Sequence, residues 1–158
     1  MFEGQLVGIY VAPIAGAAME ARREVEAVAG SGLVGDRYLG ASGTYSGRRL
    51  ADPKRAVTLI EREAIVAARS ERELELGEDE TRRNLVTLGV PLNHLVDREF
   101  RVGSARLRGV DLAEPCAYLE RETRPGVRAA LVHRAGLRAE ILVGGLLRVG
   151  DTISPIGR

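Results

Sequence analysis

Cysteine and long apolar runs are scarce in this sequence of 158 residues. Cys116 is the single cysteine, so an intramolecular disulfide framework is excluded and the composition fits a reducing compartment. No uninterrupted apolar run approaches the ~18 residues of a spanning helix. The N-terminus lacks a basic segment followed by an apolar stretch, so no secretory signal is predicted. We therefore expect a cytoplasmic protein with no membrane partner.

Histidines, aromatic residues and net charge are equally limited. Lys+Arg total 23 and Asp+Glu total 22, a balance that does not favour a DNA-wrapping protein. The four tyrosines, among them Tyr38, Tyr45 and Tyr118, are too few for a single-strand stacking platform, so no nucleic-acid partner is predicted. His94 and His133 are the only histidines, so a histidine-based metal cage lacks ligands.

The length and the patterning favour a single domain over residues 1–158 that is mainly β. Nineteen glycines and six prolines divide the chain into short segments. Short apolar or alternating runs predict strands at 6–11, 20–28, 56–60 and 83–90. Glycine-containing pairs predict two hairpins, one joining 100–102 to 105–108 and one joining 137–143 to 146–149.

Helical patterning is confined to two places. Residues 61–69 are predicted to form a helix, in which Ala64, Ala67 and Ala68 share an apolar face with the preceding Ile60. Acidic residues come early and arginines late, as a helix dipole favours. Residues 117–122 are predicted to form one or two helical turns. The whole pattern indicates a β-barrel or sandwich with one or two short helices. The Gly-rich stretch 30–47 is long for a loop, and long ordered loops are often functional.

Cys116 is the first candidate site residue. Pro115 fixes the backbone just before it, and the following turn would place the sulfur at a helix start, where the thiolate is favoured. A thiolate ligates soft metals and attacks electrophiles. Glu114 opposes thiolate formation, and a lone cysteine is also commonly a small buried hydrophobe. Both readings remain open at this point.

Arg82 and Asn84 form the second candidate. A guanidinium grips phosphate bidentately and an amide adds directional donors, so the pair could clamp an anion. Strand alternation would place both side chains on the same face. The alternative is a solvated strand edge without a ligand.

Two further candidates are weaker. Asp36 and Arg37 lie in the glycine-containing stretch 32–38, where they could contact a ligand or form an internal ion pair that shapes the loop. His133 could act as a base or proton donor toward Cys116. It could equally be a hydrogen-bonded structural histidine.

Taken in order, these segments resemble a known family. The motifs are Gly35-Asp36-Arg37-Tyr38, Val57-Thr58-Leu59-Ile60, Arg82-Arg83-Asn84-Leu85, Glu114-Pro115-Cys116 and His133-Arg134-Ala135-Gly136-Leu137. The chain resembles a stand-alone MOSC domain, the module found at the C-terminus of molybdenum cofactor sulfurases. The resemblance covers nearly the whole chain.

That resemblance implies a barrel-like MOSC fold and a molybdenum cofactor. Cys116 would be the metal ligand, and Arg82 and Asn84 would hold the pterin or its phosphate. From the residues themselves, we further expect Asp36 and Arg37 to bind the cofactor and His133 to join Cys116 in catalysis. Related reductases remove oxygen from N-hydroxylated compounds, and such a reductase would need a redox partner protein.

Two other functions remain open on the same residues. Cys116 could instead carry a persulfide received from a sulfur-donor protein, with His133 or a nearby arginine easing thiolate formation. The chain could also be a non-catalytic anion-binding module, in which ligand binding depends on Arg82 but not on Cys116.

Overall fold

A computed structural model describes residues 1–39 and 52–157; residues 40–51 and 158, including Tyr45 and the second half of the predicted 30–47 loop, lie outside the described residues. The described elements are β1 (Gly4–Val11), β2 (Glu20–Arg22), β3 (Glu24–Val28), β4 (Gly32–Leu33), β5 (Val57–Glu61), α1 (Arg62–Arg72), β6 (Leu85–Leu88), β7 (Glu99–Val102), β8 (Ala105–Leu112), α2 (Ala117–Glu122), α3 (Val127–Ala130), β9 (Leu137–Val143), β10 (Gly145–Arg148) and β11 (Thr152–Pro155). Three short 3-10 helices join them: Pro53–Arg55, Asp79–Thr81 and Leu92–Leu95.

Seven of these strands close into a mixed barrel. The strand order is β11-β7-β8-β9-β5-β6-β1, and β1 pairs with β11 to complete the ring. Only the β5–β6 pair within this ring is parallel, and α1 makes the crossover between these two strands. The expectation of a mainly β, barrel-like fold is confirmed. Two of the three α-helices coincide with predicted ones, and the four-residue α3 was not predicted.

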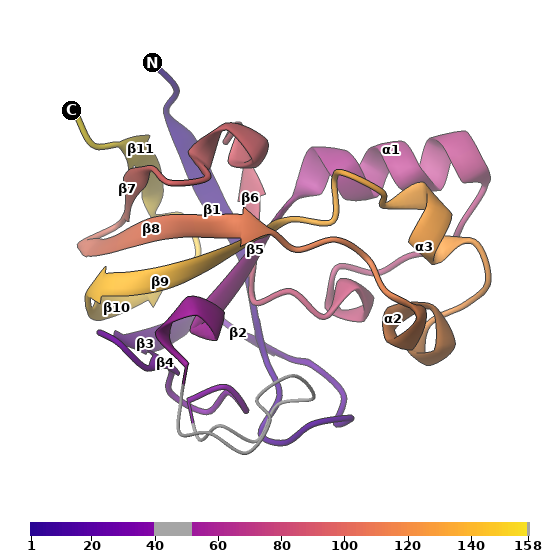
Figure 1. The fold of residues 1–158 in the computed structure, drawn as a ribbon, viewed down its shortest axis with the longest axis horizontal. Helices are drawn as coiled ribbons and strands as arrows, with labels where there is room; N and C mark the ends of the chain where they lie inside the picture. The colour runs from indigo at the N-terminus through magenta and orange to yellow at the C-terminus, as the bar shows by residue number, and fades with distance from the viewer. Residues whose placement is uncertain (40–51, 158) are drawn as a thin grey trace.

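The barrel interior and the helical layer form two separate apolar cores. Leu59 and Leu85 face the barrel interior, together with Phe100, Leu107 and other fully buried side chains. Their neighbours Ile60 and Val86 point outward, where α1, α2 and α3 cover them. Strands β5 and β6 are therefore buried on both faces. The three helices lie together on one side of the barrel (Figure 1).

The predicted α1 helix is confirmed and continues to Arg72. Its buried residues are Ala64, Ile65 and Ala68. Ile65 and Ala68 pack with Ile60 and Val86 in the helical-layer core. The hairpin around Gly103 is also confirmed, with Val102 paired to Ala105 and Gly103 in the left-handed region at φ 57°. These elements depend on residues close together in sequence.

The second predicted hairpin is wrong. Strand β9 pairs with β5 and β8, whereas β10 pairs with β3 in a separate three-stranded sheet, β10-β3-β4. Neither Gly144 nor Gly145 adopts the positive φ that a two-residue hairpin turn needs at these positions. A Cβ at Gly144 would overlap the carbonyl of Ala27, so this glycine permits a close crossing between the two sheets.

Two predicted strands have different limits in the structure. The predicted strand 20–28 is divided at Arg23 into β2, which extends the barrel sheet beyond β1, and β3, which belongs to the small sheet. The predicted strand 83–90 is reduced to β6, Leu85–Leu88, because Arg82 sits in a left-handed turn. No helix of residues 1–39 and 52–157 combines the length and the apolar character needed to span a membrane.

Candidate functional site

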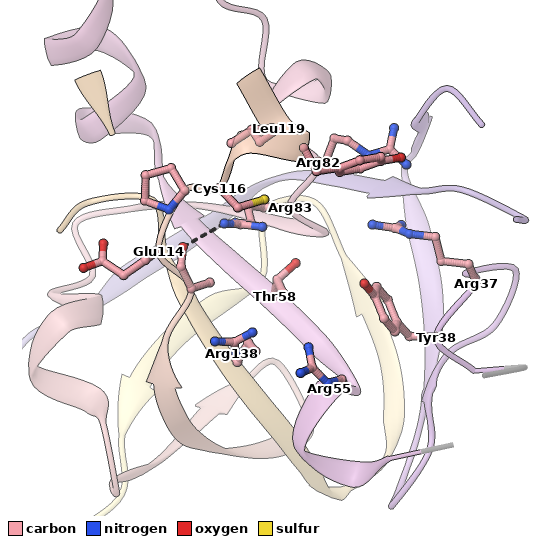
Figure 2. Close-up of a pocket in the computed structure, with 13 residues that line it drawn as sticks. Arg37, Tyr38, Arg55, Thr58, Arg82, Arg83, Glu114, Cys116, Leu119 and Arg138 are labelled. Carbon is pink, nitrogen blue, oxygen red and sulfur yellow. Dashed lines mark hydrogen bonds between the residues drawn. The ribbon is translucent and has the colours of Figure 1, made fainter. Parts of the chain in front are cut away.

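A pocket of about 400 Å³ opens where the helical layer meets the barrel (Figure 2). Its lining comes from the 37–38 turn, the start of β5, the turn before β6, the segment from the end of β8 into α2, and β9. Among the described residues, five arginines contribute to this lining: Arg37, Arg55, Arg82, Arg83 and Arg138. Glu114 is the only carboxylate among these lining residues.

Cys116 lies in this pocket. Pro115 ends the extended segment, and Cys116 then caps α2 with extended backbone angles, φ −127° and ψ 170°. The Glu120 amide donates to the Cys116 carbonyl at 3.2 Å, which starts the helix. The thiol is half-buried, and Figure 2 shows the sulfur beside the Arg83 guanidinium. The structure therefore leaves the sulfur accessible to a small molecule instead of sealing it in the core.

Arg82 contributes a buried donor that no described residue pairs with. It follows the 3-10 helix Asp79–Thr81 in a left-handed conformation, φ 61°. Its Nη1 donates to the Ala17 carbonyl at 2.9 Å, but its buried Nη2 has no hydrogen-bond partner among the described residues. Burial and the nearby Arg37 charge lower the pKa of Arg82. A guanidinium nitrogen of this kind favours an anionic hydrogen-bond partner.

Arg83 also lines the pocket, and it is held by backbone carbonyls. Its Nε donates to the Ala135 carbonyl at 2.8 Å and its Nη2 donates to the Ala113 carbonyl at 2.7 Å. Within the described part of the chain, no carboxylate pairs with it. Burial, followed by repulsion from Arg138, lowers the pKa of Arg83 to about 10, while the Cys116 sulfur acts in the opposite direction. The guanidinium stays charged at neutral pH and favours an anionic neighbour.

Asp36 and Arg37 form an internal ion pair, one of the two alternatives that their spacing left open. The Arg37 Nη1 donates to the Asp36 Oδ1 at 3.0 Å, and both side chains are buried. Asp36 Oδ1 also accepts from the Ala12 amide at 3.1 Å, which ties the turn to the end of β1. Arg37 lines the pocket, and its guanidinium lies 4.8 Å from the Tyr38 ring centroid. Asp36 is not among the residues that line the pocket.

Asn84 does not reach the pocket lining. Its side chain is fully buried, and its Oδ1 accepts from the Thr58 amide at 3.1 Å and from the Thr58 hydroxyl at 3.2 Å. Its Nδ2 donates to the Tyr10 carbonyl at 3.1 Å. The expected common face for Arg82 and Asn84 does not form, because Arg82 lies in a turn and not in a strand. Asn84 joins β5 to β1 behind the pocket wall.

His133 is likewise outside the pocket lining. Its side chain is exposed, and its Nδ1 lies 2.6 Å from the Glu114 Oε2. Its backbone amide donates to the Glu114 Oε1 at 2.7 Å. His133 therefore contacts the residue two positions before Cys116, and it holds the Glu114 side chain at the pocket rim.

Arg55 and Arg138 are pocket residues that the sequence did not single out. Thr58 of β5 pairs with Arg138 of β9, so the register of the barrel brings this arginine to the site. Arg138 is partly neutralised by Asp111, at 2.7 Å. No local spacing connects these residues to Cys116, and only the general excess of arginine over lysine could have signalled them.

The arrangement places a soft sulfur nucleophile beside several guanidinium groups. Within the described part of the chain, Arg37 pairs with Asp36 and Arg138 with Asp111, whereas Arg82 and Arg83 donate to backbone carbonyls. Glu114 adds one negative charge to the lining. The lining therefore keeps excess positive charge. Such a pocket suits an anionic small molecule that presents its reactive atom to Cys116.

The MOSC domain family matches residues 46–154, more than half of the chain. The chain belongs to the MOSC domain family. The resemblance inferred from the ordered motifs is thus confirmed. The match covers β5 through β11 and includes every residue of the pocket except Arg37 and Tyr38.

Solved structures share the architecture of this MOSC domain. The YuaD protein from Bacillus subtilis superposes with a TM-score of 0.77 at 16% identity, covering 97% of both chains. YiiM from Geobacillus stearothermophilus has a TM-score of 0.74 at 14% identity, covering 98% of this chain and 76% of its own. YiiM from Escherichia coli has a TM-score of 0.65 at 18% identity, with 100% and 71% covered. At these identities the likeness establishes the fold alone. No curated protein sequence matches the chain.

Proposed function

We propose that this MOSC domain binds a molybdenum cofactor in the arginine-lined pocket, with the Cys116 sulfur as a ligand of the metal. The observation that carries the proposal is the meeting, in one pocket, of a half-buried thiol and five arginine side chains, including Arg82, whose Nη2 has no hydrogen-bond partner among the described residues. The cofactor combines the two complementary features, a thiophilic metal and an anionic phosphate on its pterin.

The donor set of the pocket fits this cofactor better than a bare metal ion. No group of three His, Cys, Asp or Glu side chains within residues 1–39 and 52–157 could hold a metal by itself. Cys116 can supply one thiolate, a soft ligand suited to a sulfur-ligated metal. The remaining ligands would come from the pterin dithiolate. A volume of about 400 Å³ is within the usual range for small-molecule sites.

Each lining group has a defined task in this proposal. Arg82 donates its free Nη2 to the phosphate, and Arg37, fixed by Asp36, adds a second guanidinium. Asn84 holds β5 and β1 together behind them, and His133 holds Glu114 at the rim. The bound cofactor would supply the redox chemistry, and the reaction class we propose is reduction of N-hydroxylated compounds, with electrons from a partner protein.

Metal analysis tests the cofactor proposal. Protein made in a host that synthesises the cofactor should contain molybdenum, and Cys116→Ser should lose most of it because an alcohol is a poor ligand for a soft metal. Arg134→Gln is the matched control, since Arg134 pairs with Glu71 away from the pocket and should keep the metal. Absence of molybdenum from the wild type, or equal content in Cys116→Ser, would overturn the proposal.

A second candidate function is sulfur carriage by Cys116. The observation in its favour is the accessible sulfur among guanidinium groups, which stabilise an anionic persulfide. In the transfer, the Cys116 thiolate attacks the outer sulfur of a donor persulfide; a Cys116 persulfide forms and the donor thiolate leaves. Incubation with a persulfide donor should add the mass of one sulfur atom to the wild type and none to Cys116→Ser. An unchanged intact mass would remove this candidate.

A further inference from the structure

One guanidinium group joins the segment that carries Cys116 to a neighbouring turn. After β8 ends at Leu112, residues 113–116 cross the pocket wall before α2 begins. The Ala113 carbonyl accepts from Arg83 Nη2 at 2.7 Å, the bond drawn as a dashed line in Figure 2. The same guanidinium donates through Nε to the Ala135 carbonyl at 2.8 Å. Arg83 therefore bridges the cysteine segment and the turn that leads into β9.

A backbone hydrogen bond joins the same two segments. The Ala113 amide donates to the Gly136 carbonyl at 2.8 Å. Gly136 in turn lies directly against the backbone of Leu59 in β5. The 135–136 turn therefore connects residues 113–116 to the barrel wall. Arg83, which immediately precedes Asn84 and β6, ties that wall to the turn and to the cysteine segment at once.

Only an arginine can make this bridge. Its planar fork directs separate N–H groups toward two carbonyls from one rigid group, whereas a lysine ammonium is a compact point charge on a flexible stem. Burying the charge opposes ionisation, as the lowered pKa of Arg83 shows. A buried charge without a carboxylate partner among the described residues lowers the stability of the fold. The two hydrogen bonds to backbone carbonyls are therefore the feature of Arg83 that serves the site.

We propose that Arg83 is a positioning residue for Cys116, holding the 113–116 segment against the 135–136 turn so that the sulfur faces the pocket. The assignment rests on the proposed role of Cys116 as the reacting sulfur. Arg83 acts through the two carbonyls of Ala113 and Ala135, and its charge alone does not replace this bridge. A lysine at position 83 therefore does not replace Arg83 in positioning Cys116.

Amide hydrogen exchange measured by NMR tests the bridge directly, together with molybdenum content. Arg83→Lys and Arg83→Gln should each raise the exchange rate of the Ala113 amide by about tenfold, because the charged hydrogen bond that anchors this segment is lost. Amides of Phe100 and Leu107 in the β7–β8 hairpin should keep their wild-type rates. Both variants should lose most of the molybdenum, while Arg134→Gln matches the wild type in every measurement.

Each other outcome overturns the assignment. Wild-type exchange and metal content in Arg83→Lys would show that charge alone matters. A uniform increase that includes Phe100 and Leu107 would show a general loss of stability. Local exchange without metal loss would show that the order of the segment is irrelevant to the site. If the wild type itself holds no molybdenum, the cofactor proposal fails, and the exchange rates alone decide whether Arg83 positions the Cys116 segment.

Discussion

Replacing Gly136 by alanine should lower the free energy of unfolding by about 2–5 kcal/mol, the sum of left-handed backbone strain and a steric overlap. Gly136 has φ +115°, where a side chain is strained, and a Cβ there would overlap the carbonyl of Leu59. Leu59 belongs to β5, which is paired on both sides within the barrel and cannot move away. Urea denaturation followed by circular dichroism measures the loss.

Gly150→Ala is the matched control for this prediction. Gly150 also has a positive φ, +101°, but a Cβ there would meet no atom within 4 Å. Its substitution should cost only the backbone strain, about 1–2 kcal/mol. Equal losses in the two variants would show that the contact with Leu59 contributes nothing, and that the turn before β9 is not packed as described.

Asn84→Ala should lower the free energy of unfolding by about 2–4 kcal/mol, because it leaves buried backbone groups without partners. The Thr58 amide loses its acceptor and the Tyr10 carbonyl loses a donor. Both groups lie at the pocket wall, where the side chain and the backbone of Asn84 join β5 to β1 beside the β6 ladder. Thermal unfolding monitored by calorimetry measures the effect.

Asn93→Ala is the control that separates the loss of the Asn84 hydrogen bonds from the general effect of replacing an asparagine. Asn93 is exposed and donates one hydrogen bond to the His133 carbonyl at 2.7 Å, so its substitution should cost less than about 1 kcal/mol. Molybdenum content per folded molecule distinguishes the two roles discussed for Asn84. An Asn84→Ala protein that keeps wild-type stability but has lost the metal would contradict the assignment of Asn84 as a support of the fold.

Elements whose cause is local were predictable from the sequence. Helix α1 follows from an alanine-rich face and ordered charges, and the β7–β8 hairpin follows from the Gly103 turn. The paired glycines at 144–145 have an equally strong local signal for a hairpin, yet the strands on either side join different sheets. The closure of the barrel determines which strands pair, and local turn chemistry does not contain this information.

The residues of the candidate site also fall into two groups, those that the sequence predicted and those that only the fold brings together. Cys116 and Arg82 were identified from their residue types and neighbours, and they share one pocket. The expected face shared by Arg82 and Asn84 fails because a left-handed residue interrupts the strand period. Arg138 reaches the pocket through its pairing with Thr58, which lies 80 positions earlier in the chain, so no motif could reveal it.

By itself, the sequence determined the β-rich class, the position of the long helix and the single thiol available for chemistry, because these depend on composition and on short-range periodicity. Only the tertiary structure decided that five arginines line the pocket of that thiol, that Asn84 joins β5 to β1 outside the lining, and that Arg83 contacts the cysteine segment. These contacts join residues far apart in the chain. Their geometry is set by the register of barrel closure and by the packing of the helical layer on β5 and β6.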